Sequence, residues 1–359
     1  MSRFLSARLG AGRPYQPGEQ PQRRTYVKLN TNESPFPPSP AARAALAGAQ
    51  AAERLNRYPD PACGELAAAI ARRFGLATEQ VLPGNGSDEL LAFCFLAFTG
   101  GARGAAFPAV SYGFYPVFAS LAGADALRVP LREDYTIAPE DYFGLGRMIV
   151  LANPNAPTGI ALTRAQVEAV VRENPDAPVV VDEAYVDFGA ESAVPLIARY
   201  DNLIVVQTFS KSRSLAGLRL GMALACPALI ADLNAVKYRF NPYNVSRPAQ
   251  LAGAAAIADE AYFAACTERI RSERARTEAA LRALGFFVLP SQANFLFARH
   301  DALPGRALYE GLRARGVLVR HFDAPETAAF VRISIGTRAD MDALLTAVRD
   351  VLNERGVLT

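Results

Sequence analysis

A single lysine, Lys211, lies between two serines directly after the β-branched run LIVVQ, in the stretch TFSKSRSLAGLRLG. A lysine at the end of a hydrophobic parallel strand is partly removed from water, which favours the neutral, nucleophilic amine. Ser210 and Ser212 can donate hydrogen bonds to an anion, and Arg219 has a forked, permanently charged guanidinium that suits phosphate. The alternative is a solvated lysine at the sheet edge, with Arg219 in a surface ion pair. The spacing alone leaves both interpretations open.

Glycines and small polar residues form a second stretch, GNGSDELL, at residues 84–91. Gly86, Ser87 and Asp88 can present backbone N–H groups and the positive end of a helix dipole to a phosphate. A helix N-cap, in which Ser87 or Asp88 accepts first-turn amides, accounts for the same residues. The stretch is not a Walker loop, because no GK[ST] follows. It also misses the dinucleotide pattern, because Glu89 stands where GxGxxG requires its third glycine.

Further side chains have both a structural and a chemical interpretation. Asp182 follows the run VVV and can cap a helix, pair with an arginine, or hold a protonated ring nitrogen. Tyr185, three residues later, can reach the same ligand if the turn between them is helical. Tyr112 belongs either to the core or to a site where its flat face stacks on a planar ring. Arg332, inside the apolar run FVRISIG, needs an anionic partner, either a structural carboxylate or a substrate group. A phosphate cradle, a carboxylate for a pyridinium nitrogen, a stacking face and a strand-end lysine together predict pyridoxal phosphate as the cofactor.

Composition excludes several other classes of function. The 359 residues are 51% hydrophobic and 20% charged, with a net charge of +3 and no basic run interleaved with aromatics, so nucleic acid is not an expected partner. The longest apolar run, LLAFCFLAF, is too short to span a bilayer, and MSRFLSARLG lacks the apolar core of a signal peptide. Four scattered cysteines and two histidines predict reduced thiols, no metal site and no Ser-His-Asp hydrolase. We therefore expect a cytoplasmic protein.

Short apolar runs alternate with amphipathic stretches from about Val81 onward, which predicts a parallel α/β sheet buried on both faces. Polar or glycine-rich residues follow five of these runs: PGNGSDEL, PAVSYGFY, NPNAPTG, DEAY and SKSRSLAGLR. Ligands bind at the carboxyl ends of such strands, so these five stretches are expected to form one site. The expected division is an N-terminal arm with the start of a small domain (1–40), a large cofactor-binding domain (41–250) and a small C-terminal domain (251–359).

Motifs in a consistent order cover nearly the whole chain: PYQPG, KLNTNESPFPPSP, RYPDP, GNGSDELL, SYGFYPVFASLAGA, NPNAPTG, VDEAYVDF, FSKSRSLAGLRLG, PYNVSRPAQ, GVLVRHF and VRISIGT. With these motifs the chain resembles the histidinol-phosphate aminotransferase family, among the fold-type-I pyridoxal-phosphate enzymes. The resemblance implies an α/β fold with a large domain built on a mainly parallel seven-stranded sheet, a smaller α/β domain and an N-terminal arm. It also implies a homodimer with shared active sites.

The resemblance implies a role for each motif residue. Lys211 forms a Schiff base with the cofactor, Asp182 holds the proton of the pyridine nitrogen, and Tyr185 bonds the ring 3-hydroxyl. Tyr112 stacks on the ring. The cofactor phosphate is held by Gly86, Ser87 and Asp88 through backbone amides, by Ser210 and Arg219, and by Tyr58 from the other subunit. Arg332 binds the anionic group of the substrate, with Arg320, Tyr15 and Asn32 nearby.

One position departs from the family pattern. The family usually has an asparagine immediately before PTG, hydrogen-bonded to the ring 3-hydroxyl, whereas this chain has Ala156 there, after Asn155. Alanine cannot make that bond. Either Asn155 reaches the ring, which is how we assign it, or Tyr185 makes the contact alone.

The expected reaction is a ping-pong transamination between histidinol phosphate and 2-oxoglutarate in histidine biosynthesis. Three alternatives remain at this point. An aromatic amino acid can replace histidinol phosphate, because an arginine such as Arg332 binds a carboxylate or a phosphate alike. A decarboxylase of O-phospho amino acids shares the fold and nearly every cofactor residue. A non-catalytic regulatory module would require a DNA-binding domain, and the short, proline-rich N-terminal arm does not resemble one.

Overall fold

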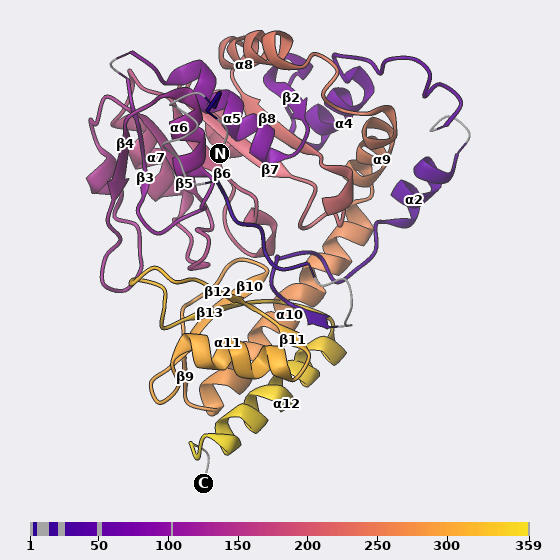
Figure 1. Ribbon diagram of the computed structural model, residues 1–359. Coiled ribbons are helices and arrows are strands. Elements are labelled where there is room, and N and C mark those ends of the chain that lie inside the picture. Colours follow the sequence, from indigo (N-terminus) through magenta and orange to yellow (C-terminus); the bar gives the residue numbers. More distant parts are fainter. Residues whose placement is uncertain (1–2, 6–13, 21–25, 49–51, 102, 358–359) are drawn as a thin grey trace.

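The computed structural model describes residues 3–5, 14–20, 26–48, 52–101 and 103–357, so most of the stretch MSRFLSARLG lies outside it. Figure 1 shows two lobes: a large sheet with its helices in the upper part, and a small sheet with α11 and α12 below. The long helix α10 (Glu260–Ala283) extends from one lobe to the other. Among the described residues, no helix is both long enough and apolar enough to cross a membrane.

The large sheet has seven strands in the order β2-β8-β7-β6-β5-β3-β4. Their bounds are β2 (Val81–Gly84), β3 (Ala105–Pro108), β4 (Ala126–Val129), β5 (Met148–Ala152), β6 (Val179–Asp182), β7 (Leu203–Thr208) and β8 (Gly221–Ala225). β8 runs antiparallel to both of its neighbours, β7 and β2, and the other pairs are parallel. The expected mainly parallel seven-stranded sheet is confirmed.

The central strands β5, β6 and β7 are buried at every residue because helices cover both faces of the sheet. Alternate residues point to opposite faces, so Val179 and Val181 belong to one core and Val180 to the other. The first core includes α4 (Gly64–Phe74), α7 (Arg164–Arg172) and α9 (Arg247–Ala258). The second includes α5 (Ser87–Phe98), α6 (Tyr115–Ala122) and α8 (Pro227–Phe240). This two-sided burial explains the continuous β-branched runs in the sequence.

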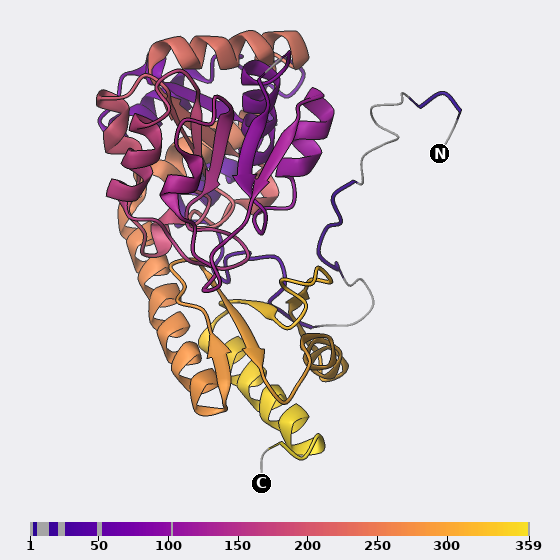
Figure 2. The same ribbon diagram turned by 90° about the vertical axis from the view of Figure 1, so that its left-hand side faces the viewer.

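The smaller lobe has an antiparallel sheet in the order β12-β13-β10-β9. The strands are β9 (Phe286–Val288), β10 (Phe295–His300), β12 (Arg320–His321) and β13 (Val331–Ser334), packed with α11 (Gly305–Ala314) and α12 (Arg338–Glu354). Figure 2 shows α10 descending along this sheet, with α12 beside it. The N-terminal strand β1 (Val27–Lys28) pairs in parallel with β11 (Val317–Leu318), so the start of the chain joins the C-terminal lobe.

Short segments complete the order of elements. Ser39 caps α2 (Pro40–Ala47) by accepting the N–H of Ala42, and α2 packs against α9. Five 3₁₀ turns connect longer elements: Thr78–Gln80, Pro139–Tyr142, Val186–Phe188, Val194–Ala198 and Ala216–Leu218. The turn after β6 curls as the sequence allowed, because Val186 N–H donates to the carbonyl of Glu183. The same turn leads from Asp182 to Tyr185.

Candidate active site

One cavity of about 340 Å³ lies at the carboxyl ends of the parallel strands, within the range of small-molecule sites. All five strand-end stretches contribute to its lining. They supply Ser87 and Asp88 after β2, Tyr112 after β3, and Ala156 after β5. Asp182 at the end of β6 is followed by Ala184 and Tyr185, and Ser210 and Lys211 follow β7. The small lobe and the N-terminal segment add Tyr15, Asn30, Thr31, Glu33, Arg320 and Arg332. The strand ends therefore meet in a single site, as the sequence predicted.

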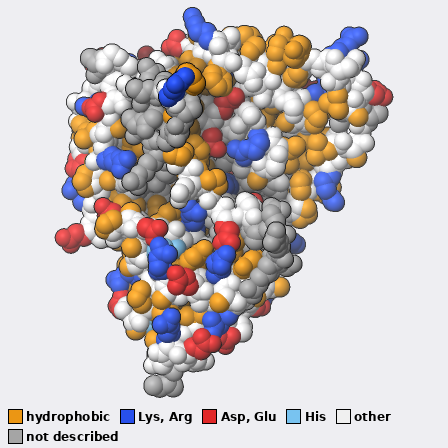
Figure 3. Space-filling model, in the orientation of Figure 1, with side chains coloured by type: hydrophobic (Ala, Val, Ile, Leu, Met, Phe, Trp, Pro, Cys, Tyr) orange, Lys and Arg blue, Asp and Glu red, His pale blue; other side chains and the backbone are white. Residues whose placement is uncertain are grey.

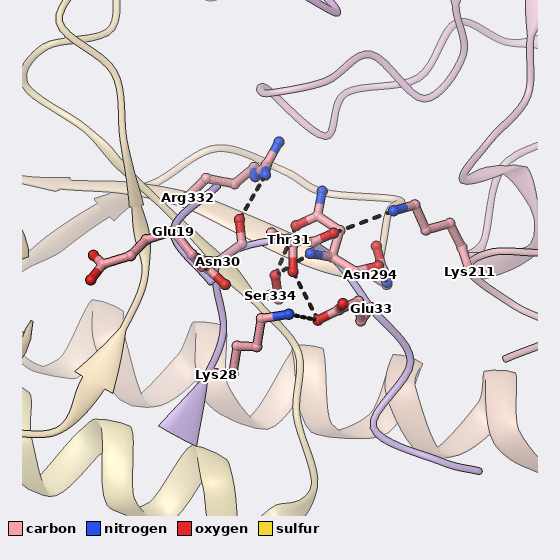
Figure 4. A network of polar contacts seen from close by, with 10 residues as sticks. Glu19, Lys28, Asn30, Thr31, Glu33, Lys211, Asn294, Arg332 and Ser334 are labelled. Atoms are coloured by element: carbon pink, nitrogen blue, oxygen red, sulfur yellow. Dashed lines mark hydrogen bonds and ion pairs between the residues drawn. The ribbon is translucent and has the colours of Figure 1, made fainter. Parts of the chain in front are cut away.

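Lys211 lies in the cavity wall and not on the outer edge of the sheet. Its Nζ donates to the carbonyl of Thr31 at 3.3 Å (Figure 4). The same Nζ lies 5.8 Å from the centre of the Tyr185 ring. Its neighbour Ser212 points elsewhere, because its Oγ donates to Asp187 Oδ2 at 2.5 Å. The amine is thus half-buried beside an aromatic ring, in a place where it can contact a ligand in the cavity.

Asp182 presents a buried carboxylate to the same cavity, with only 4% of its surface exposed. Its Oδ2 accepts a hydrogen bond from Tyr115 Oη at 2.7 Å, and its Oδ1 accepts from Ala184 N–H at 3.2 Å. Burial raises the pKa of Asp182 to about 6, although both hydrogen bonds oppose that rise. The carboxylate is therefore mostly ionised at neutral pH and suits a cationic ring nitrogen.

The amino end of α5 forms an anion cradle with Arg219 and Ser210. Gly86 caps α5 without a side-chain hydrogen bond, so neither Ser87 nor Asp88 is the N-cap and the first-turn amides are not satisfied by a cap. Gly86 has φ = +88°, and a Cβ there would lie 2.8 Å from Arg219 Nη2. Arg219 Nη1 donates to Ser210 Oγ at 3.3 Å and Nη2 to Asp88 Oδ2 at 3.3 Å. A glycine packed under an arginine and a free helix end fits a phosphate.

Tyr112 combines a stacking face with a fixed hydroxyl. Its Oη donates to Asp88 Oδ1 at 2.7 Å, and its ring meets the Tyr115 ring edge-on at 5.6 Å between centres. Burial and the nearby Asp88 carboxylate raise the pKa of Tyr112, so the phenol stays protonated. The ring lines the cavity, where a planar ligand can stack on it.

Asn155 and Ala156 occupy different places. The Asn155 amide is engaged with the segment after β3 and with its own loop. Oδ1 accepts from Ser111 Oγ at 2.7 Å, and Nδ2 donates to the Val110 carbonyl at 3.0 Å and to Thr158 Oγ1 at 3.2 Å. Ala156, and not Asn155, is among the described residues that line the cavity. The structure therefore does not bring the assigned Asn155 to the site, whereas Tyr185, three residues after the end of β6, lines it.

Two arginines of the small sheet face the cavity. Arg332 Nη2 donates to the Asn30 carbonyl at 3.1 Å, while its buried Nε has no hydrogen-bond partner among the described residues. Burial lowers the pKa of Arg332. Arg320 donates to the carbonyls of Gln16 and Pro17 at 3.1 and 3.3 Å. Within the described part of the chain neither arginine pairs with a carboxylate, so both suit a substrate anion.

The other predicted residues are placed as follows. Tyr15 lines the cavity and stacks on Phe114 with 4.3 Å between ring centres. Asn32 lies behind the lining and donates from Nδ2 to Tyr185 Oη at 3.0 Å. Tyr58 is 76% exposed, stacks on Tyr243 at 4.4 Å and does not line the cavity of its own chain.

Reasoning from the sequence missed several contributors, and two of them, Tyr115 and Thr31, contact predicted site residues. Tyr115 lies three residues after Tyr112, at the start of α6, and this helical spacing was the available signal. Thr31 contributes its backbone carbonyl to Lys211, a role that no side-chain pattern indicates. Within the described residues, no group of three or more His, Cys, Asp or Glu is arranged to hold a metal ion.

Aminotransferases are among the known proteins that match this chain in sequence and in fold. A sequence model described as aminotransferase class I and II matches residues 24–348, and the chain belongs to this family. Histidinol-phosphate aminotransferase 1 of Bordetella parapertussis is 50% identical over 356 residues, covering 98% of this chain and 100% of that protein. The protein of the same name from Bradyrhizobium diazoefficiens is 52% identical over 352 residues, with coverage of 98% and 100%.

A solved structure agrees with the sequence relatives. The crystal structure of histidinol-phosphate aminotransferase from Sinorhizobium meliloti, in complex with pyridoxal-5'-phosphate, superposes with a TM-score of 0.89 at 27% identity, covering 99% of each chain. The fold is thus that of the fold-type-I aminotransferases.

Proposed function

We propose that the protein is a pyridoxal-phosphate-dependent aminotransferase that transfers the amino group of histidinol phosphate to 2-oxoglutarate, in histidine biosynthesis. Relatives that carry this name match over nearly the whole chain at about 50% identity. The observation that carries the proposal is a cavity with Lys211 in its wall, one arginine from the large lobe and two from the small lobe. Such a site has separate cationic groups for a cofactor phosphate and for a substrate phosphate.

The cavity fits pyridoxal phosphate. The free amino end of α5 with Ser210 and Arg219 would hold its phosphate, Tyr112 would face its ring, and Asp182 would hold the proton of its ring nitrogen. When bound, this cofactor supplies an electron sink that stabilises negative charge at the substrate Cα. Asp182 supports that role because it is ionised above about pH 6 and is shielded from water. We propose Tyr185 as the donor to the ring 3-oxygen.

Lys211 is the group proposed to move the proton. Its Nζ would hold the cofactor and would accept the proton of the substrate Cα. The Thr31 carbonyl holds the amine at the cavity wall, and its half-buried position limits competition from water. Arg332 and Arg320 would orient the substrate by binding its anionic group, with Tyr15 closing one side.

We further propose a homodimer in which Tyr58 reaches the cofactor phosphate of the partner. Exposed apolar side chains of the large lobe support an interface: Leu55, Tyr58, Tyr238, Phe240 and Tyr243. Figure 3 shows hydrophobic side chains over the upper, large lobe, whereas charged and hydrophobic side chains are mixed over the small lobe. We also propose a cytoplasmic location. We propose as well that the chain divides at residues 40 and 250 into the N-terminal arm, the large domain and the small domain.

A single-turnover screen of amino donors tests the substrate. The holoenzyme is mixed with histidinol phosphate, phenylalanine or an O-phospho amino acid, and loss of the absorption band of the bound cofactor is followed. Fast reaction with histidinol phosphate and slow reaction with phenylalanine are expected. The reverse order would assign an aromatic substrate, and carbon dioxide released from the O-phospho amino acid would assign a decarboxylase.

A further inference from the structure

The segment of residues 29–34, here called the strap, crosses from the small sheet to the turn that carries Lys211 (Figure 4). Leu29 N–H donates to the Leu318 carbonyl at 2.8 Å, and the Leu29 carbonyl accepts from Ser334 N–H at 2.9 Å. Two residues further along the strap, the Thr31 carbonyl accepts a hydrogen bond from Lys211 Nζ. The strap is therefore anchored on both lobes and can hold side chains in fixed positions beside the cavity.

Asn32 is the most constrained residue of the strap. It has φ = +55° and is 1% exposed. Its N–H donates to Ser334 Oγ at 2.8 Å, and its carbonyl accepts from Asn294 Nδ2 at 3.0 Å. Asparagine is one of the few residues other than glycine that adopt this left-handed conformation. Ser334 is the last residue of β13, and Asn294 directly precedes β10. The backbone of Asn32 is therefore held by two neighbouring strands of the small lobe.

The Asn32 amide lies between two hydroxyl groups, those of Ser334 and Tyr185. Ser334 Oγ donates its single proton to Asn32 Oδ1 at 2.8 Å. With Oδ1 toward Ser334, the amide nitrogen Nδ2 points toward Tyr185. Nδ2 then donates to Tyr185 Oη at 3.0 Å. Because the Tyr185 hydroxyl accepts this bond, its own proton is left for an acceptor in the cavity that Tyr185 lines.

We propose that Asn32 is a positioning residue for Tyr185, which holds the tyrosine hydroxyl as a donor toward the 3-oxygen of the cofactor ring. This role is especially important in this chain, because Ala156 has no amide to bond that oxygen and the Asn155 amide is engaged with Ser111 and Val110. Asn32 acts through Tyr185, so it is not itself a group that contacts substrate. The inference rests on the proposed function, since Tyr185 needs the cofactor as its acceptor.

The test is Asn32→Gly in the full-length holoenzyme, because glycine keeps the left-handed backbone and removes only the amide. The pH midpoint of the absorption change of bound pyridoxal phosphate is measured without substrate. We expect the midpoint to rise by about half a unit to one unit, because a less well bonded 3-oxygen keeps more negative charge and retains the neighbouring proton. Equilibrium dialysis should show weaker binding of pyridoxal phosphate as well.

Two further variants separate positioning from a general structural effect. Ala156→Asn in the Asn32→Gly background supplies a second donor and should return the midpoint toward the parent value. In a Tyr185→Phe background, Asn32→Gly should add no further shift. Ser334→Ala, which keeps Asn32 itself, should give a smaller shift in the same direction and serves if the glycine variant does not fold.

An unchanged midpoint in Asn32→Gly, or an equal shift in the Tyr185→Phe background, would overturn the inference while leaving the proposed function intact. A parent protein that binds no pyridoxal phosphate would instead overturn the proposed function, and with it the basis of the inference.

Discussion

Tyr115 Oη donates a 2.7 Å hydrogen bond to Asp182 Oδ2, and neither side chain is exposed to solvent by more than a few per cent. Burial and the Asp182 carboxylate raise the pKa of Tyr115, so the phenol remains a donor throughout the working range of pH. This bond favours the ionised form of Asp182 and so lowers its pKa. Burial has the larger and opposite effect, and the pKa of Asp182 is raised to about 6. Tyr115 therefore helps to keep the carboxylate charged at neutral pH.

Tyr115→Phe should move the acid limb of the kcat/KM profile to higher pH. Removal of a donor to the ionised carboxylate raises its pKa further, so activity that depends on the charge is lost earlier as the pH falls. A hydrogen bond to a charged group is worth about 1.5–3 kcal/mol, which corresponds to a shift of about one to two pH units. Tyr142→Phe is the matched control, because Tyr142 is also buried and its hydroxyl has no partner among the described residues. An unmoved limb in Tyr115→Phe would contradict this role.

Asp182→Asn should still bind pyridoxal phosphate but lose turnover on the order of 10²–10³-fold, because a neutral amide no longer stabilises a cationic ring nitrogen. Glu183→Gln changes the adjacent buried carboxyl, which bonds Ser192, Ala193 and Gln207 and does not line the cavity among the described residues. That control should turn over close to the parent rate. Steady-state kinetics at saturating cofactor measure both variants, and equal losses would argue for a structural effect.

Lys211→Ala should abolish the borohydride-reducible bond to the cofactor and lower turnover on the order of 10²–10⁴-fold. The chain has three lysines, Lys28, Lys211 and Lys237, so peptide mapping after reduction gives an unambiguous answer. Lys28 pairs with Glu33 and Lys237 bonds the Pro61 carbonyl, so neither is free to replace the missing amine. Label on either lysine in the parent protein would refute the assignment.

Arg332→Gln should raise the KM for histidinol phosphate by about 10- to 100-fold, because a charge-assisted hydrogen bond is lost. The KM for histidinol, which has no phosphate, should change little. Comparison of the two donors removes any general effect on folding or cofactor binding. A similar rise for both donors would show that Arg332 does not bind the phosphate.

Mixed dimers test the proposed contribution of Tyr58. The Lys211→Ala homodimer and the Tyr58→Ala homodimer are each expected to have low activity at limiting cofactor. In a mixed dimer one of the two sites combines Lys211 from one subunit with Tyr58 from the other. Activity should therefore reappear after subunit exchange. Size-exclusion chromatography checks that both variants remain dimers. Absence of any recovery in verified mixed dimers would place Tyr58 outside the partner's site.

The predictions from sequence were strongest where the signal is local. The runs that became β5, β6 and β7, and the polar residues directly after them, were recognisable because burial on both faces and turn chemistry act over a few neighbouring residues. The rule that ligands bind at strand carboxyl ends then places Asp182 and Lys211 in one site from the sequence alone. The antiparallel direction of β8 was not predicted, since its apolar run resembles those of the parallel strands.

The sequence by itself therefore determined the class of fold, the cofactor and the residues of the strand ends, because each leaves a pattern within a short window. Only the tertiary structure decided which side chains complete the site. Asn32 and Tyr185 are 153 positions apart, and Asn32 and Ser334 are 302 apart, so their contacts depend on how the two lobes pack. Within the large lobe, the Asn155 amide turns toward Ser111 and Val110 after β3 while Ala156 faces the cavity, a choice between adjacent residues that no periodicity encodes.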